Sequence, residues 1–461
     1  MKRGFLNKIP GVKKKEKHQS TTGSFKARTV VVDAVPKDLR DALPLSNSVS
    51  SNRLAQLPKD LVDMIFKGLN LDDLMRVSCV CQSWKVLASS LLPAENSKMW
   101  LIVPLGEDSS EKIDSIWDET LGFFSLSNGK TYKVEIPQIV DRRICGSSPG
   151  GWLITVHENG EIQLLHPFSK AVLDLPPITK LPGIPDSFIH KNKRFYLIPN
   201  IECGKEVGKQ RMDSELVREI YIKKVVMSSS KSPTTSILMC IQECRMKLAF
   251  CRPGKDEKWI SVEGDDNRRF DDVTFYQGQF YAVQGTGHVF VVENLDSFSP
   301  FVKPVISPPY KIGSDKYYLV EFNGELLLVM RFLYEHQEDP SYWESDDFDI
   351  EAAESYMTTR FEVFELDFDG SRWVKVFDLG KDHALFVGDN QSFSLRTSDI
   401  PGCKGNCIYF TDDYAEQNIC DYPVGGFDIG VFDMESGSTK KCYPTDARVI
   451  RPPPLWFTTH R

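Results

Sequence analysis

The chain has 461 residues, of which 41% are hydrophobic and 26% charged, as in a globular protein large enough for two or three domains. Its formal net charge is −8, which argues against general binding to nucleic acid or to an anionic membrane, because both need a surplus of Lys and Arg. The eleven scattered cysteines, and the lack of an apolar segment behind the basic N-terminus, predict a reducing compartment rather than secretion.

The N-terminal segment, residues 1–52, is predicted to be a disordered basic tail. Residues 1–40 hold eleven Lys or Arg against three acidic residues, with no apolar periodicity that could offset the entropy lost on ordering. The run from Lys13 to Lys17 fits a nuclear localisation signal, part of an acid-poor organellar presequence, or a solvated charged tail. We expect the protein in the nucleus, the cytoplasm or both.

Residues 57–91 form a predicted helical module, because their apolar residues recur every three or four positions. Pro58 suits the first position of a helix, and Gly68 can end that helix in a left-handed conformation. The spacing predicts helices over 58–67, 71–79 and 82–91. The apolar positions are Leu61, Ile65, Leu69, Leu74, Val77, Cys81, Trp84, Leu87 and Leu91.

From residue 99 onward the pattern is that of short strands. Asn-Gly pairs at 128–129, 159–160 and 323–324 separate strand-like runs and predict two-residue hairpin turns, since both central residues of such a turn need positive φ. The runs repeat with a period of about 35 to 60 residues, as expected of propeller blades that bury their faces against neighbouring blades. The sequence predicts six or seven blades; two packed β-sandwiches are the alternative.

Two polar stretches interrupt the strands. Residues 202–219 are one, and residues 335–354 are the other, with nine acidic residues in twenty positions. The acidic stretch is predicted to be a solvated loop, although Tyr342, Trp343 and Phe348 within it could also attract a basic partner.

No catalytic, metal or cofactor site is predicted. Cys240, Cys244 and Cys251 are close in sequence, as are Cys403 and Cys407, but the even spacing of the first pair places it on one face of a strand, so buried thiols are expected rather than a zinc site. The sequence has no nucleophile elbow, phosphate-binding glycine loop or zinc-protease helix. An enzyme whose residues meet at the centre of a propeller remains the alternative.

The helical module resembles the F-box in its Leu57-Pro58 start, its apolar stripe, its Val80-Cys81 pair and Trp84, with Phe66 where Leu is commoner. The resemblance covers residues 53–91 directly, within an F-box domain expected at residues 53–95. It implies a three-helix module that docks on a Skp-family adaptor and, through it, on a cullin-based ubiquitin ligase. The alternative is that the stripe packs on the β domain of the same chain. The implied adaptor contacts are Leu57, Pro58, Leu61, Ile65, Leu69, Leu74, Val80, Cys81 and Trp84.

Residues 96–461 resemble the plant F-box proteins that carry a C-terminal KIB-type β-propeller. The similarity lies in Met99-Trp100-Leu101, in the strand at 151–156 and in the ending from Asp428 to Phe457. It implies a mainly β fold, an F-box followed by a propeller, and a non-catalytic subunit of an SCF (Skp–cullin–F-box) ubiquitin ligase whose propeller binds an unknown protein substrate. A scaffold or inhibitor that binds a partner without ubiquitinating it is the alternative. Neither a membrane nor a nucleic acid is expected as a direct partner.

Overall fold

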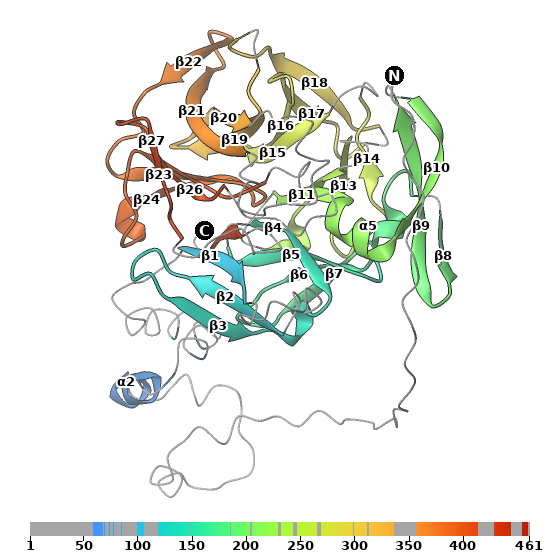
Figure 1. Cartoon of the computed structure of the whole chain (residues 1–461), viewed down its shortest axis with the longest axis horizontal. Coiled ribbons are helices and arrows are strands. Elements are labelled where there is room, and N and C mark those ends of the chain that lie inside the picture. Colours follow the sequence, from blue (N-terminus) through green and yellow to red (C-terminus); the bar gives the residue numbers. More distant parts are fainter. Residues whose placement is uncertain are drawn as a thin grey trace, which may run out of the picture. The chain divides into compact units, whose positions relative to one another are not determined.

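The structure is a computed structural model, and Figure 1 shows the whole chain. It describes residues 59–67, 69, 73, 77, 84, 99–105, 119–148, 150–184, 186–202, 205–228, 232–242, 247–264, 269–297, 299–310, 313–335, 356–413, 428–443 and 454–459. The predicted basic tail, the acidic stretch from 336 to 354 and most of the predicted second and third helices lie outside these residues.

The first predicted helix is present as α2 (Lys59–Lys67), within one residue of its expected bounds. Leu69 N–H donates to the Phe66 carbonyl at 3.1 Å, which closes the last turn at the predicted break. Asp73, Val77 and Trp84 also have helical backbone. Among the described residues no helix is long and apolar enough to cross a membrane.

Most of the chain from Met99 onward folds into antiparallel sheets arranged around a common centre (Figure 1). The first two blades are β28-β1-β2-β3 and β4-β5-β6-β7. Their bounds are β28 (Leu455–Thr458), β1 (Met99–Pro104), β2 (Thr120–Phe124), β3 (Thr131–Glu135), β4 (Arg142–Ser148), β5 (Trp152–His157), β6 (Ile162–Leu165) and β7 (Val172–Leu175).

The next three blades follow the chain in simple order. They comprise β11 (Ile222–Met227), β12 (Leu238–Gln242), β13 (Lys247–Cys251) and β14 (Ile260–Ser261); β15 (Phe270–Tyr276), β16 (Gln279–Gln284), β17 (Val289–Glu293) and β18 (Phe301–Ile306); and β19 (Lys316–Phe322), β20 (Glu325–Glu335), β21 (Tyr356–Asp367) and β22 (Arg372–Val376).

The sixth blade departs from this pattern because it has an additional strand at one edge and one parallel pair. Its order is β24-β23-β25-β26-β27, in which β23 and β25 run parallel. Its strands are β23 (His383–Val387), β24 (Phe393–Arg396), β25 (Cys407–Phe410), β26 (Gly430–Asp433) and β27 (Ser438–Lys440).

A seventh, three-stranded sheet with a short helix stands between the second and third blades in sequence. It consists of β8 (Asp186–His190), β9 (Lys193–Glu202) and β10 (Lys205–Asp213), followed by α5 (Ser214–Ile220). Short 3-10 turns lie elsewhere, at η3 (Pro137–Ile139), η4 (Ile178–Lys180), η5 (Pro233–Thr235) and η8 (Thr397–Asp399).

The hydrophobic core is a series of layers between consecutive blades. Blade 1 shares one layer with blade 2, and further layers join blades 2 to 3, 3 to 4, 4 to 5 and 5 to 6. A sixth layer, which contains Phe386 and Trp456, joins blade 6 back to blade 1. Since both faces of a blade are covered, strands such as β11 and β12 are buried at every position. The described residues therefore form a β-propeller of six blades, the smaller of the predicted numbers.

The ring is closed by the end of the chain. β28 pairs antiparallel with β1, with Leu101 opposite Trp456, so the last strand completes the first blade. Trp456 is fully buried and packs edge to face on Phe386 of blade 6. The C-terminal strand thus contributes to both the first sheet and the final interface between blades.

The hairpins exist where Asn-Gly pairs predicted them, but the predicted two-residue turn was right only at Asn323-Gly324. There φ is 52° and 89°, and Phe322 pairs directly with Glu325. At 128–129 and 159–160 only the glycine has positive φ, and the loops are longer. The Asn side chain explains the difference: Oδ1 of Asn128 accepts from Lys130 N–H at 2.9 Å, a local bond that favours a wider turn.

Candidate functional site

Helix α2 presents an exposed apolar face. Leu61, Met64 and Ile65 are 41%, 65% and 44% exposed and lie three and four residues apart, so they share one side of the helix. Val62 and Phe66, four residues apart on the adjacent side, are buried. The sequence and the backbone together thus divide this helix into a covered side and an apolar side in contact with solvent.

The predicted adaptor residues fall into different environments. Leu61 and Ile65 are on the exposed face, whereas Leu69 and Trp84 are half-buried. Phe66 and Trp84 meet edge to face with ring centroids 5.4 Å apart. Trp84 therefore packs at least partly inside the module. Sequence reasoning missed Met64, although its spacing from Leu61 is helical. The other predicted residues, Leu57, Pro58, Leu74, Val80 and Cys81, lie outside the described residues.

The centre of the propeller contains a group of buried charged side chains. Nζ of Lys224 on β11 lies 2.6 Å from Oδ1 of Asp272 on β15, and both side chains are almost fully buried. Asp272 also accepts backbone N–H groups from Val273 at 2.8 Å and Leu319 at 3.0 Å. Burial raises the pKa of Asp272, and these donors and Lys224 oppose the rise. The ion pair joins blades 3 and 4, and the hydrogen bond from Leu319 N–H joins Asp272 to blade 5.

The loop between β23 and β24, residues 388–392, reaches this centre from the sixth blade. The Gly388 carbonyl accepts from Nζ of Lys224 at 3.0 Å. Gln391 N–H donates to the Ser147 carbonyl at 3.1 Å, and its Oε1 accepts from Met227 N–H at 3.3 Å. Ser147 belongs to β4 and Met227 to β11. One loop thus contacts strands of the second and third blades across the ring.

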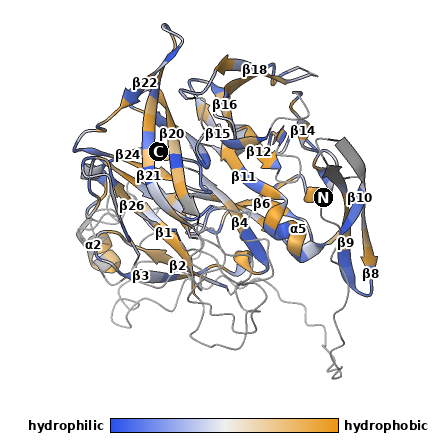
Figure 2. Cartoon of the chain, turned by 45° about the horizontal axis from the view of Figure 1, so that its top comes forward, coloured by the Kyte–Doolittle hydropathy of each residue, from blue (hydrophilic) through white to orange (hydrophobic). Residues whose placement is uncertain are grey.

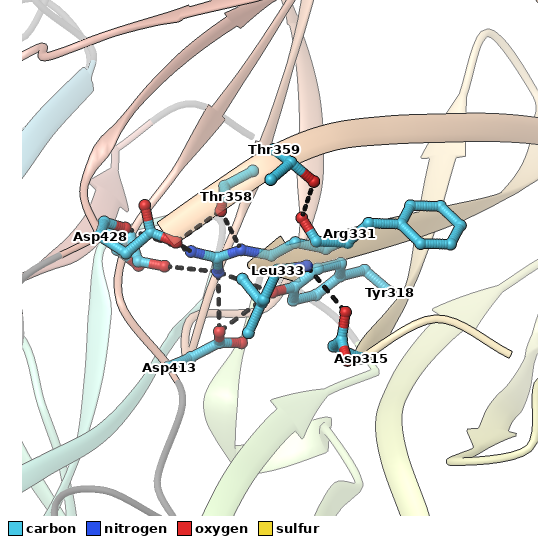
Figure 3. Close-up of polar contacts among 10 residues, drawn as sticks. Asp315, Tyr318, Arg331, Leu333, Thr358, Thr359, Asp413 and Asp428 are labelled. Atoms are coloured by element: carbon cyan, nitrogen blue, oxygen red, sulfur yellow. Dashed lines mark hydrogen bonds and ion pairs between the residues drawn. The ribbon is translucent and has the colours of Figure 1, made fainter. Parts of the chain in front are cut away.

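Arg331 organises another group, between blades 5 and 6 (Figure 3). Its guanidinium lies 2.9 Å from Oδ1 of Asp413 and 2.8 Å from Oδ2 of Asp428, and its side chain is 1% exposed. Nε donates to Oγ1 of Thr358 at 2.7 Å, and Nη1 donates to the Tyr318 hydroxyl at 3.1 Å. These partners satisfy a buried charge that would otherwise be costly.

Two aspartates at the centre have shifted pKa values of opposite sign. Burial would raise the pKa of Asp413, but Lys316, Arg331 and Lys224 outweigh burial and lower it. Asp389 is half-buried, and its pKa is raised to about 6 by desolvation and by the neighbouring Asp413 carboxylate. The charges at the centre are therefore engaged mainly with one another, an arrangement suited to fixing the blades in position.

Of the cysteines considered for a metal site, Cys240, Cys251 and Cys407 are core residues and Cys403 is half-buried, while Cys244 lies outside the described residues. Cys240 and Cys251 lie on paired strands within the core layer between blades 2 and 3, and burial raises the pKa of both thiols. Cys403 and Cys407 have pKa values raised by burial to about 11. Within the described residues no group of three His, Cys, Asp or Glu side chains is arranged to hold a metal ion.

Comparison with known proteins matches both parts of the chain. The F-box-like family model matches residues 54–92, and the KIB1-4 beta-propeller model matches residues 123–433. Three similar proteins come from Arabidopsis thaliana. F-box protein SKIP23 is 30% identical, covering 88% of this chain and 95% of that protein. F-box protein At2g17036 is 28% identical over the same shares, and putative F-box protein At5g55150 is 27% identical over 86% and 94%. Both resemblances seen in the sequence are confirmed.

Proposed function

Because the chain belongs to the family of F-box proteins with a KIB1-4 β-propeller, we propose that it is the substrate-recognition subunit of an SCF ubiquitin ligase. The F-box binds a Skp-family adaptor, which joins the chain to a cullin, and the propeller holds a protein substrate. The bond-forming chemistry belongs to an associated ubiquitin-conjugating enzyme, so this chain acts by raising the effective concentration of substrate lysines.

The observation that carries this proposal is the exposed face of α2. An apolar side chain loses roughly 25 cal/mol of favourable burial for each Å² left in water, so a row of Leu61, Met64 and Ile65 is costly unless a partner covers it. This face lies within the segment matched by the F-box model. The basic run at residues 13–17 supports a nuclear location, and the net charge of −8 is compatible with the cytoplasm.

The adaptor interaction is tested by charging this face. Leu61→Asp combined with Ile65→Asp is expected to weaken co-purification with a Skp-family adaptor more than tenfold, because carboxylates would be desolvated in the interface. The matched control is Val172→Asp with Val374→Asp, whose side chains are 41% and 43% exposed on propeller strands. The control should bind normally. Equal binding by the α2 variant and the wild-type chain, with unchanged circular dichroism, would refute adaptor docking on this face.

The ligase role is tested separately from the adaptor interaction. Proteins that co-purify with the full chain should accumulate when cullin neddylation is blocked, and should not do so when the Leu61→Asp, Ile65→Asp chain replaces it. A partner that binds the propeller but whose abundance is unaffected would identify the chain as a scaffold or an inhibitor instead.

A further inference from the structure

Exposed apolar side chains gather at blade 5 of the propeller. Twelve of the described large apolar residues are exposed, and three of these form the face of α2. Of the other nine, five belong to blade 5 or to the segments that flank its strands: Tyr310, Met357, Phe368, Val374 and Phe377. Phe377, at 74%, is the most exposed of the twelve. Exposed apolar residues that gather in one region of a soluble protein mark a candidate interaction surface.

Strand β22 is the outermost strand of this blade, and its outer edge is turned away from the ring. The order β19-β20-β21-β22 places it at the periphery, as Figure 1 shows. It pairs with β21, from Asp367 opposite Arg372 to Val363 opposite Val376. Within the described part of the chain, no other backbone group bonds to this strand. Every second residue of β22 therefore directs its N–H and C=O outward, where another strand could pair with them.

Most outer strands of the other blades are protected against such pairing. β14 has two residues, β27 has three, and β3 exposes only polar side chains. β18 contains Pro304, which has no N–H, and Glu263 bonds to its start: Glu263 N–H donates to the Pro300 carbonyl at 2.7 Å, and Val302 N–H donates to the Glu263 carbonyl at 3.1 Å. β22 has five residues, three of them apolar, and Val374 among them is 43% exposed.

Aromatic rings extend the apolar surface beside this edge. Nζ of Lys375 on β22 lies 6.0 Å from the ring centre of Tyr310 and 5.6 Å from that of Phe377, so both rings stand next to the strand. Tyr310 is held in place because its ring packs edge to face on Phe364 of β21 at 5.4 Å. In Figure 2, hydrophobic and hydrophilic residues alternate along β21, the strand that pairs with β22. Since successive residues alternate, Val374 lies on the face opposite to Lys375.

The charges beside β22 are unbalanced in favour of carboxylates. Its two cations are already paired: Arg372 lies 3.0 Å from Asp367, and Lys375 lies 3.1 Å from Glu362. The carboxylates near the strand that form no ion pair with any described cation are Glu365, Asp369 and Asp378. The turn between β22 and β23 adds one exposed cation, Lys381. The edge of β22 is therefore apolar, open along its main chain, and bordered by unpaired negative charge.

We propose that a segment of a substrate protein adds to the outer edge of β22 as a further strand, and that this segment alternates apolar with polar residues and carries Lys or Arg near its ends. The proposal deepens the proposed function by naming a docking edge and the chemistry of its ligand, and it rests on that function. Main-chain hydrogen bonds hold the added strand. Val374 on one face, and Tyr310 and Phe377 on the other, cover its apolar side chains. The unpaired carboxylates attract its cations and speed the encounter.

The features of this edge favour an extended, basic protein segment over other partners. A helix has its own N–H and C=O groups bonded internally, so it cannot pair with an open edge. A nucleic acid or an anionic membrane needs a surplus of cations on the protein. Blade 5 has the opposite balance: its described residues from 313 to 335 and from 356 to 382 include ten acidic and six basic residues.

The test is an array of short peptides in which Val, Ile or Phe alternates with Ser or Thr, with either Lys or Glu at both ends, probed with the full chain. Peptides with Lys at the ends should bind, and their fluorescein-labelled forms should saturate in fluorescence anisotropy; those with Glu should bind more weakly. Val374→Lys is expected to weaken binding about tenfold or more, and Phe377→Ala severalfold. Binding of the Lys peptides should weaken as salt is raised.

Methylation of the peptide backbone distinguishes strand addition from other modes of binding. Only alternate N–H groups of an added strand donate to β22, and the intervening ones point away from the sheet. N-methyl groups at every second position of a bound peptide should therefore abolish binding, whereas N-methyl groups at the intervening positions should change it little.

The matched control is Val172→Lys on β7, the outer strand of blade 2. It makes the same substitution at a valine that is 41% exposed, but no other exposed large apolar residue lies in the described turns on either side of that strand. It should leave peptide binding unchanged. Adaptor co-purification by the Val374→Lys chain should also be unchanged, and the Leu61→Asp, Ile65→Asp chain should still bind the peptides, which separates this proposal from the adaptor interaction.

The role of the carboxylates is tested with its own pair of variants. Asp369→Asn with Asp378→Asn should weaken binding of the Lys peptides severalfold, because each change removes one unpaired negative charge beside β22. The control is Glu257→Gln with Glu435→Gln, which changes the net charge equally at two exposed residues of blades 3 and 6 and should not affect binding.

Four results would overturn the proposal. The first is an array in which no alternating peptide with Lys at its ends binds. The second is equal weakening by Val172→Lys and Val374→Lys, which would place binding elsewhere. The third is a response to N-methylation that does not alternate along the peptide, which would exclude strand addition. The fourth is a dimer of the chain in sedimentation velocity that Val374→Lys dissociates; this would make the occupant of the edge a second copy of the chain.

Discussion

At the scale of single residues, the propeller depends on a few buried charges that local sequence does not reveal. Arg331 follows the apolar run 326–330, and its partners Asp413 and Asp428 are more than eighty residues away. Nothing in the spacing of these residues indicates that they meet, so the sequence could not predict this group. A buried ion pair adds little net stability, but it penalises any arrangement that separates its members. We infer that Arg331 helps to fix blade 6 against blade 5.

Asp389 leads to a prediction at this scale about pH. Its pKa of about 6 in the folded chain exceeds its ordinary value of 3.8, so the folded state binds this proton more tightly than the unfolded state. Its contribution to stability is present at low pH and is lost as pH rises from about 4 to 6. Asp389→Asn removes this half-buried charge and should raise the free energy of unfolding at pH 7 by about 1–3 kcal/mol.

The measurement is denaturant unfolding of the variant and the wild-type chain at pH 7 and pH 4.5. The difference between them should be larger at pH 7. A variant that is less stable at both pH values would show instead that the ionised Asp389 is held by the surrounding cations.

At the scale of elements, the sequence predicted the helices and hairpins that depend on neighbouring residues. It missed the strand pairings that join residues far apart in the chain. The capping residues and apolar spacing placed α2 within one residue, and Asn-Gly pairs located the hairpins. The strand β28 was not assigned as the partner of β1, because that pairing joins the two ends of the propeller sequence. The turn at Lys191-Asn192 was missed because Lys rarely adopts positive φ. Of the predicted adaptor residues, the structure describes Leu61, Ile65, Leu69 and Trp84.

The two sides of α2 predict different results of mutation. Phe66→Ala or Trp84→Ala removes one ring of the edge-to-face pair and should cost about 2–4 kcal/mol of local stability, so adaptor binding should fall together with helical circular dichroism. In contrast, Leu61→Asp with Ile65→Asp should reduce binding while the helical signal remains. If Trp84→Ala reduced binding without any loss of helical signal, Trp84 would be a direct contact, as the sequence alone suggested.

At the scale of the whole molecule, the fold class was predictable from the sequence but the number of blades was not. The stretch 202–219, which was predicted to interrupt the strands, instead contains β10 and most of α5. Strands β8, β9 and β10 are 5, 10 and 9 residues long, within the range of the blade strands, so a count of strands leaves room for a seventh blade. What distinguishes them is burial: a blade is covered on both faces, whereas Phe188 on this sheet is exposed. Whether a sheet face is covered depends on which other sheet packs against it. The periodicity of apolar residues in a strand does not specify that packing.

A closed ring of layers also predicts cooperative unfolding. Phe386 is fully buried between blades 6 and 1, where it contacts Phe393, Tyr409 and Trp456. Phe386→Ala should destabilise the propeller by about 3–5 kcal/mol, and far-ultraviolet circular dichroism and tryptophan fluorescence should shift together. Phe377→Ala, at a side chain 74% exposed, is the control and should change neither signal. Separate transitions by the two probes would show that the blades unfold independently.

The position of β28 has a consequence for biosynthesis. The ribosome makes this strand after every other strand of the propeller, so the first blade lacks a member and the ring stays open until β28 has been made. Helix α2 emerges hundreds of residues earlier and has a contact within its own module, between Phe66 and Trp84. We therefore expect a polypeptide that stops before β28 to engage the proposed adaptor without being able to recognise a client, and nonsense variants upstream of the β28 codons to act as dominant competitors for that adaptor.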